Sequence, residues 1–215
     1  MEKVTAFIFD VDGVLVDSEY ANFVSLNRAL ERHLEISIKF EDDQKLGPIP
    51  TFKKLDILSK RFGVEISESI RDEFLKDKFV FLQDEIKNGK IKFNTEANGI
   101  FEFIKSLGCK TGIVSNARSE YLEQVKNTLR ISELVDVCIS NSFKLPTKPN
   151  PSMYLRAMSD LGVSPKSTIV FEDSEIGIKA AKDSAANVFH ISNFSNLTLG
   201  LVKSLYENPD QYCFV

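Results

Sequence analysis

Residues 9–18 read FDVDGVLVDS and follow an apolar run, Val4–Phe9, that predicts a buried β-strand. This strand ends at Asp10, and Asp12 follows two positions later, just before Gly13. Because open α/β sheets bind ligands at the carboxyl ends of their strands, we expect Asp10 to lie at a ligand-binding edge. Aspartate before glycine is also common in turns, so this pair alone does not establish a catalytic site.

Three further polar segments lie beside expected elements of secondary structure. IVSNAR places Ser115 and Asn116 after a second apolar strand. PTKPNP places Lys148 before a helix, in a loop whose prolines restrict the backbone. IVFEDSEIGIKAAKDSAANV places Glu172 and Asp173 after a third strand. The order and spacing of all four segments make a more specific pattern than any one of them.

With these four segments, the chain resembles the haloacid dehalogenase-like hydrolase superfamily, in the branch that includes β-phosphoglucomutase and many small-molecule phosphatases. The resemblance covers nearly the whole chain. Between Glu19 and about Lys92 it rests only on helical character and position. It implies a Rossmann-like catalytic domain with an inserted helical cap.

Hydrophobic periodicity predicts the same organisation. Helical patterns cover Glu19–Leu34, Thr51–Phe62 and Ser67–Ile86, with no convincing strand among them. After Thr95, helices alternate with short apolar strands, which we expect at Lys110–Val114, Val135–Ile139, Thr168–Phe171 and Asn187–Ile191. This alternation predicts an α/β fold, a parallel sheet flanked by helices. We expect residues 1–18 and 93–215 to form the α/β core and residues 19–92 to form an all-helical cap.

Composition limits the classes of function. The 215 residues carry 27 basic and 31 acidic side chains, and the net charge of −4 gives no support for nucleic-acid binding, which would call for a basic face. The three cysteines are widely spaced and suggest neither disulfides nor a zinc site. No apolar run approaches the ~18 residues of a membrane span, and the residues before Val4 show no basic segment with an apolar signal core, so we expect no leader segment. We therefore expect a soluble, cytoplasmic protein that binds neither membranes nor nucleic acid, of undetermined oligomeric state.

Phosphoryl transfer needs a nucleophile, neutralisation of the phosphate oxygens and a proton for the leaving oxygen. Asp10 is the candidate nucleophile, forming an aspartyl-phosphate, and Asp12 is the candidate acid and base. Lys148 is expected to approach Asp10 and the phosphate. Ser115 and Asn116 are candidates for hydrogen bonds to phosphate oxygens, although a serine and an asparagine here would also suit a helix cap.

The acidic residues also predict a Mg²⁺ site, because Mg²⁺ prefers carboxylate and carbonyl oxygens. Asp10 and Asp173 are the candidate carboxylate ligands, the backbone carbonyl of Asp12 is a third, and Glu172 is a partner directly or through water. The alternative for Glu172 and Asp173 is capping of the helix that begins near Ser174.

We therefore expect a Mg²⁺-dependent phosphatase acting on a small phosphorylated metabolite. Two alternatives stay open: a sugar phosphomutase and a non-catalytic phosphate-binding module. The resemblance argues against the mutase, because Asn22 and Pro50 stand about where β-phosphoglucomutases have a histidine and an arginine. Lysines of the insert are candidates for contact with an anionic leaving group, although lysines on exposed helices are usually solvated: Lys53, Lys54, Lys76 and Lys78.

Overall fold

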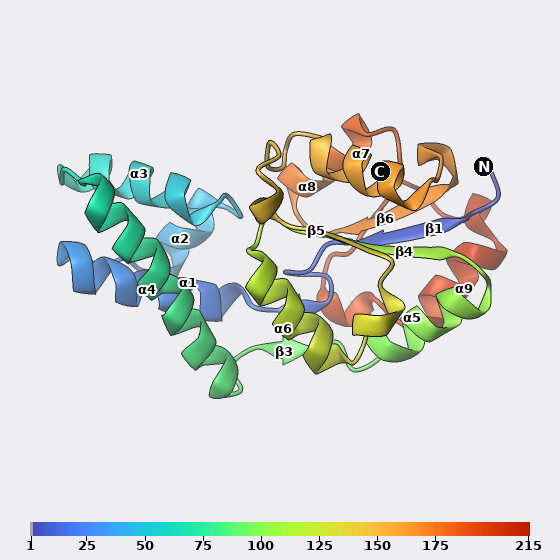
Figure 1. Ribbon diagram of the computed structural model, residues 1–215, viewed down its shortest axis with the longest axis horizontal. Helices are drawn as coiled ribbons and strands as arrows, with labels where there is room; N and C mark the ends of the chain where they lie inside the picture. The colour runs from blue at the N-terminus through green and yellow to red at the C-terminus, as the bar shows by residue number, and fades with distance from the viewer. Residues whose placement is uncertain (1) are drawn as a thin grey trace. The chain divides into compact units, whose positions relative to one another are not determined.

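A computed structural model describes residues 2–215 (Figure 1). The chain forms two compact units. One unit comprises the chain up to Asp17 together with Phe93–Val215, and the other comprises Ser18–Lys92.

The first unit is built on a five-stranded parallel sheet with the order β5-β4-β1-β6-β7. Its strands are β1 (Ala6–Phe9), β4 (Lys110–Val114), β5 (Val137–Ile139), β6 (Thr168–Glu172) and β7 (Asn187–His190). Two short strands, β2 (Val16–Asp17) and β3 (Lys92–Phe93), pair separately.

Five α-helices flank the large sheet, with α7 and α8 on one face and α5, α6 and α9 on the other (Figure 1). They are α5 (Ala97–Ser106), α6 (Ser119–Leu129), α7 (Ser152–Leu161), α8 (Glu175–Asp183) and α9 (Leu199–Glu207). Short 3₁₀ helices cover Ser132–Leu134, Asn141–Phe143, Pro165–Ser167, Phe194–Asn196 and Pro209–Gln211. The predicted α/β class is confirmed.

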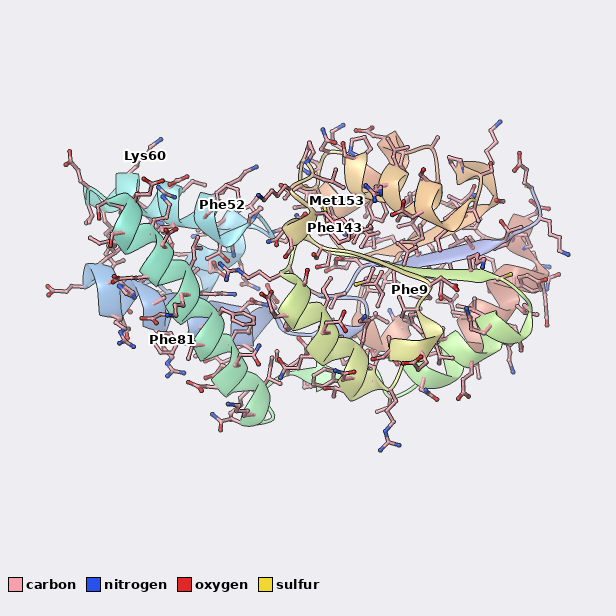
Figure 2. All side chains as sticks on the ribbon, in the orientation of Figure 1. Phe9, Phe52, Lys60, Phe81, Phe143 and Met153 are labelled. Carbon is pink, nitrogen blue, oxygen red and sulfur yellow. The ribbon has the colours of Figure 1, made fainter. Side chains whose placement is uncertain are left out.

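Successive residues of β1 point to opposite faces of the sheet, as in any strand. Ile8 packs in a cluster with side chains of α7 and α8, including Met153. Phe9 points the other way and contacts Phe101 of α5, with ring centroids 4.7 Å apart. Phe9 and Met153 therefore mark the two faces of the sheet (Figure 2).

Strand register brings the candidate site residues together. Phe9 is paired with Ile113 of β4 on one side and with Phe171 of β6 on the other. Asp10 continues this alignment, because its backbone N–H donates to the carbonyl of Phe171 at 3.0 Å. The polar residues that follow the three strands consequently share one edge of the sheet.

The second unit contains four helices, α1 (Glu19–Leu34), α2 (Phe40–Leu46), α3 (Thr51–Phe62) and α4 (Glu68–Lys87). Its core is formed by aliphatic and aromatic side chains, chiefly Leu26, Leu30, Leu55, Leu58 and Phe74. On α1, the Arg28 guanidinium lies 4.1 Å from the ring centroid of Phe81 on α4 (Figure 2). That this unit acts as a cap stays a prediction.

Several elements differ from the sequence-based expectations. Strands β2 and β3 were not predicted, because two residues are too few to show an alternating pattern. Helix α2 was not predicted, because FEDDQKL has too few apolar residues to show a helical period. Strand β5 begins at Val137 rather than Val135, and just before it the Asp136 carboxylate accepts the backbone N–H of Thr111 at 2.8 Å. Within residues 2–215, every helix is too short or too polar to cross a membrane.

Candidate active site

The loop after β1 is a tight turn that begins at Asp10. Asp10 is buried, with 8% of its surface exposed. Gly13 has φ +81°, and its N–H donates to the Val16 carbonyl at 2.7 Å. A Cβ atom at Gly13 would run into the carboxylate of Asp173. Glycine therefore permits both the left-handed backbone and the close approach of this loop to Asp173.

Three carboxylates meet at this edge of the sheet. Asp10, Glu172 and Asp173 each offer an oxygen, and these oxygens lie within 4.8 Å of one another. Glu172 is completely buried at the end of β6, whereas Asp173 is half-buried. Such a set of hard oxygen donors fits a divalent cation of the Mg²⁺ type.

Lys148 supplies the positive charge that faces these carboxylates. Its ammonium donates to Asp10 Oδ1 at 2.9 Å, to Glu172 Oε1 at 2.6 Å and to the Val114 carbonyl at 2.8 Å. An ammonium has three N–H donors, and these three bonds engage all of them. Lys148 is itself 3% exposed, so the ion pairs are buried.

The surrounding charge shifts the ionisation of the cluster. Burial, followed by the charge of Glu172, raises the pKa of Asp10 well above its usual value, although Lys148 opposes this shift. Burial together with Glu172 and Asp12 raises the pKa of Asp173 to about 7. Burial would lower the pKa of Lys148, but the charges of Asp10 and Glu172 outweigh it and the pKa lies above its usual value. One ammonium thus leaves excess negative charge, which a bound cation would relieve.

The helix-capping alternative for Glu172 and Asp173 does not describe this structure. Ser174 is the N-cap of α8, and its hydroxyl accepts the N–H of Gly177 at 3.2 Å. The same hydroxyl donates to Glu172 Oε2 at 3.4 Å. A Cβ atom at Gly177 would overlap the Glu172 carboxylate, so glycine lets the first turn of α8 lie directly against this side chain.

Ser115 and Asn116 follow β4, as the sequence predicts. The Ser115 hydroxyl oxygen accepts the N–H of Ala117 at 3.1 Å. Asn116 has a role that sequence reasoning missed: its Oδ1 accepts the backbone N–H of Lys148 at 3.0 Å. Asn116 therefore holds the loop that presents Lys148.

Two tyrosines also belong to the site although no motif predicted them. Tyr121 on α6 donates its hydroxyl to Asp12 Oδ1 at 2.9 Å. Tyr154 on α7 donates its hydroxyl to Glu172 Oε1. Burial, followed by the negative charge of Glu172, raises the pKa of Tyr154 well above its usual value, so this hydroxyl stays a donor. From the sequence alone, Tyr121 and Tyr154 look like aromatic residues on the buried face of an amphipathic helix, so no pattern marks them as site residues.

Two of the candidate lysines have partners within the helical unit. Lys54 pairs with the buried Asp43, with Nζ and Oδ1 2.7 Å apart. Lys78 donates to Asn22 Oδ1 at 2.7 Å. The ion pair gives Lys54 a structural role in joining α2 to α3.

Comparison with known proteins identifies the family. Residues 4–184 match the haloacid dehalogenase-like hydrolase family, and the chain belongs to it. A phosphorylated carbohydrates phosphatase of Thermotoga maritima is 30% identical over 180 residues, which cover 82% of this chain and 80% of that protein. A phosphoglycolate phosphatase of Aquifex aeolicus is 25% identical over 177 residues, covering 81% of this chain and 78% of that protein.

Solved structures show the same fold. The crystal structure of β-phosphoglucomutase from Clostridium difficile is 21% identical, has a TM-score of 0.81 and covers 97% of this chain and 100% of that chain. At this identity the likeness establishes the fold alone. The family match and the relatives named phosphatases confirm the predicted family and enzyme class, a hydrolase of the phosphatase type.

Proposed function

We propose that this protein is a Mg²⁺-dependent phosphatase that hydrolyses a small phosphomonoester through an aspartyl-phosphate. The observation that carries the proposal is the position of Asp10. It is buried, hydrogen-bonded to Lys148, and within reach of a shared cation with Glu172 and Asp173. A nucleophilic carboxylate needs such neutralisation, because it must approach a negatively charged phosphate.

In the proposed first step, a carboxylate oxygen of Asp10 attacks phosphorus and the bond from phosphorus to the leaving oxygen breaks. Asp12 donates a proton to that oxygen, so the product leaves as an alcohol. In the second step, Asp12 takes a proton from water, which attacks the phosphorus of the aspartyl-phosphate and releases inorganic phosphate. Asp10 and Asp12 thereby return to their starting states. Lys148 would keep Asp10 oriented throughout, and the Ser115 hydroxyl would donate to a phosphate oxygen.

The acidic cluster also supports the choice of cofactor. Asp10, Asp173 and the backbone carbonyl of Asp12 would hold Mg²⁺, with Glu172 bound directly or through water. When bound, the ion neutralises negative charge on the phosphate oxygens. Buried carboxylates that repel one another and lack a bound cation are expected to have raised pKa values, as Asp10 and Asp173 do.

For the substrate, we infer a small phosphorylated metabolite and assign the helical unit Ser18–Lys92 the role of a cap that selects the leaving group. The relative from Thermotoga maritima, named a phosphorylated carbohydrates phosphatase, makes sugar phosphates the first class to assay. The expectation that nucleic acids are not partners stays a prediction.

Phosphate release from sugar phosphates, phosphoglycolate and nucleoside monophosphates, measured with Mg²⁺, tests the proposal. Asp10→Asn should reduce turnover at least ~10³-fold, because an amide cannot replace the nucleophile. Asp183→Asn on the exposed surface of α8 is the matched control and should retain turnover. Unchanged hydrolysis by Asp10→Asn would refute the nucleophile assignment.

The same assay separates the alternative functions. Interconversion of sugar phosphate isomers that depends on a catalytic bisphosphate would identify a phosphomutase. Binding of Mg²⁺ and inorganic phosphate, without release from any substrate of the panel, would identify a binding module.

A further inference from the structure

Tyr154 and Glu172 form a completely buried hydrogen-bonded pair behind the nucleophile. Tyr154 lies on α7, Glu172 ends β6, and each is 0% exposed. The tyrosine hydroxyl donates to Glu172 Oε1, and the same oxygen accepts the Lys148 ammonium at 2.6 Å. A carboxylate oxygen has about two lone-pair sites, so these two donors occupy Oε1.

The hydrogen bonds continue to the attacking residue. Lys148 uses its remaining two donors for Asp10 Oδ1 at 2.9 Å and the Val114 carbonyl at 2.8 Å. The orientation of the Asp10 carboxylate therefore depends on the ammonium, and the ammonium position depends on where Glu172 Oε1 is held.

We propose that Tyr154 is a positioning residue for the nucleophile, fixing Glu172 and through it the Lys148 ammonium that orients Asp10. This inference rests on the proposed function of Asp10. Without the hydroxyl, Glu172 Oε1 would have a vacant lone pair in a buried setting and would draw the ammonium away from Asp10.

A tyrosine hydroxyl suits this position better than a second positively charged side chain would. A neutral hydroxyl satisfies Glu172 without adding positive charge that would compete with Lys148 for the carboxylate. The Tyr154 ring also lies against the ammonium, with Lys148 Nζ 4.9 Å from its centroid. Tyr154→Phe keeps the ring and removes only the donor, which isolates the hydrogen bond from the packing.

The first test uses the unaltered protein, labelled with ¹⁵N at its lysine side chains and observed by NMR without substrate. The Lys148 ammonium should give a signal in slow exchange with water, because it is buried and fully hydrogen-bonded. A contact between its protons and a slowly exchanging Tyr154 hydroxyl proton is expected. A Tyr154 hydroxyl that exchanges rapidly with water would overturn the proposal without any variant.

The second test compares Tyr154→Phe with Tyr206→Phe, a matched control on α9 whose ring contacts Phe103. In Tyr154→Phe, the Lys148 ammonium signal should shift and exchange faster, and kcat should fall about tenfold while KM changes less than twofold. In Tyr206→Phe, the ammonium signal, kcat and KM should stay as in the unaltered protein.

An unshifted ammonium signal in a folded Tyr154→Phe would refute the positioning role, as would unchanged kcat. Because the NMR signal is read without turnover, it distinguishes failure of this inference from failure of the proposed function. If the protein hydrolyses no phosphomonoester but Tyr154→Phe still shifts the Lys148 ammonium signal, the hydrogen bonds from Tyr154 through Glu172 to Lys148 are supported. Only the assignment of Asp10 as a nucleophile then fails.

Discussion

The ammonium of Lys148 lies 2.9 Å from Asp10 Oδ1, although 138 positions separate the two residues in the chain. Both are buried. A buried charge without its partner is strongly destabilising, so each of these groups depends on the other for its ionised state. Loss of either charge would therefore lower the stability of the α/β unit and also disturb the position of Asp10, the candidate nucleophile.

Replacing Lys148 tests this dependence. Lys148→Met should lower the free energy of unfolding by about 3 kcal/mol, because Asp10 and Glu172 lose their buried counter-charge. It should also lower kcat at least ~100-fold. Chemical denaturation and phosphate release measure the two effects. Lys166→Met, at an exposed position, is the control. Equal unfolding free energies for the two variants would contradict the buried ion pair.

Gly13 offers a test of the first loop. Gly13→Ala should lower the free energy of unfolding by about 3 kcal/mol and abolish most activity, because the Cβ atom meets the Asp173 carboxylate and the backbone has a positive φ. Gly162→Ala is a matched control, since Gly162 has φ +67° and open space around it. The control should cost about 1 kcal/mol and leave kcat unchanged. If the two variants had similar effects on the free energy of unfolding and on kcat, the new Cβ atom at position 13 and the Asp173 carboxylate would be accommodating each other at little cost in free energy.

The raised pKa of Asp173 predicts how stability depends on pH in the presence of a chelator. The carboxyl group has its ordinary pKa of 3.8 in the unfolded chain and a pKa of about 7 in the folded protein. Between these values the folded state holds the extra proton, so this group's contribution makes the free energy of unfolding fall as pH rises from about 4 to 7.

Denaturation at pH 5 and pH 8, in the unaltered protein and in Asp173→Asn, measures this contribution. The loss of stability between the two pH values should be smaller in the variant. An identical pH dependence in both proteins would show that Asp173 titrates normally.

Magnesium should reverse the effect of pH, because it binds the deprotonated carboxylates. Adding Mg²⁺ should raise the unfolding midpoint more at pH 8 than at pH 5. Calorimetric titration should show at least ~10-fold weaker Mg²⁺ binding by Asp173→Asn and unchanged binding by Asp183→Asn. Equal Mg²⁺ affinities in these two variants would exclude Asp173 as a ligand.

The hydrogen bond from Lys148 N–H to Asn116 Oδ1 makes a prediction that separates two roles of Asn116. If Asn116 holds the lysine loop, Asn116→Ala should lower kcat about fivefold and cost about 1 kcal/mol of stability, with KM nearly unchanged. A large rise in KM at constant kcat would instead indicate that Asn116 binds substrate directly.

The strands of the large sheet and most helices were predictable because their signals are local, whereas the two-residue strands β2 and β3 were not predicted. Val4–Phe9 and Thr168–Phe171 are short apolar runs bounded by polar residues, and β1 and β6 lie within a residue or two of them. Helix α2 was not predicted because FEDDQKL shows no helical spacing of apolar residues. The ion pair between Asp43 and Lys54 connects α2 to α3, and a pattern of residue types along the chain does not show such a contact.

By itself, the sequence determined the α/β class, the family and which polar residues end each strand, because hydrophobic alternation and motif order are properties of the chain. Only the tertiary structure decided how those residues are joined. Asn116 supports the Lys148 loop and Tyr154 holds Glu172 because parallel register and helix packing place them within hydrogen-bonding distance. Such contacts depend on angles and separations of a few ångströms across the sheet, which no local pattern of residue types encodes.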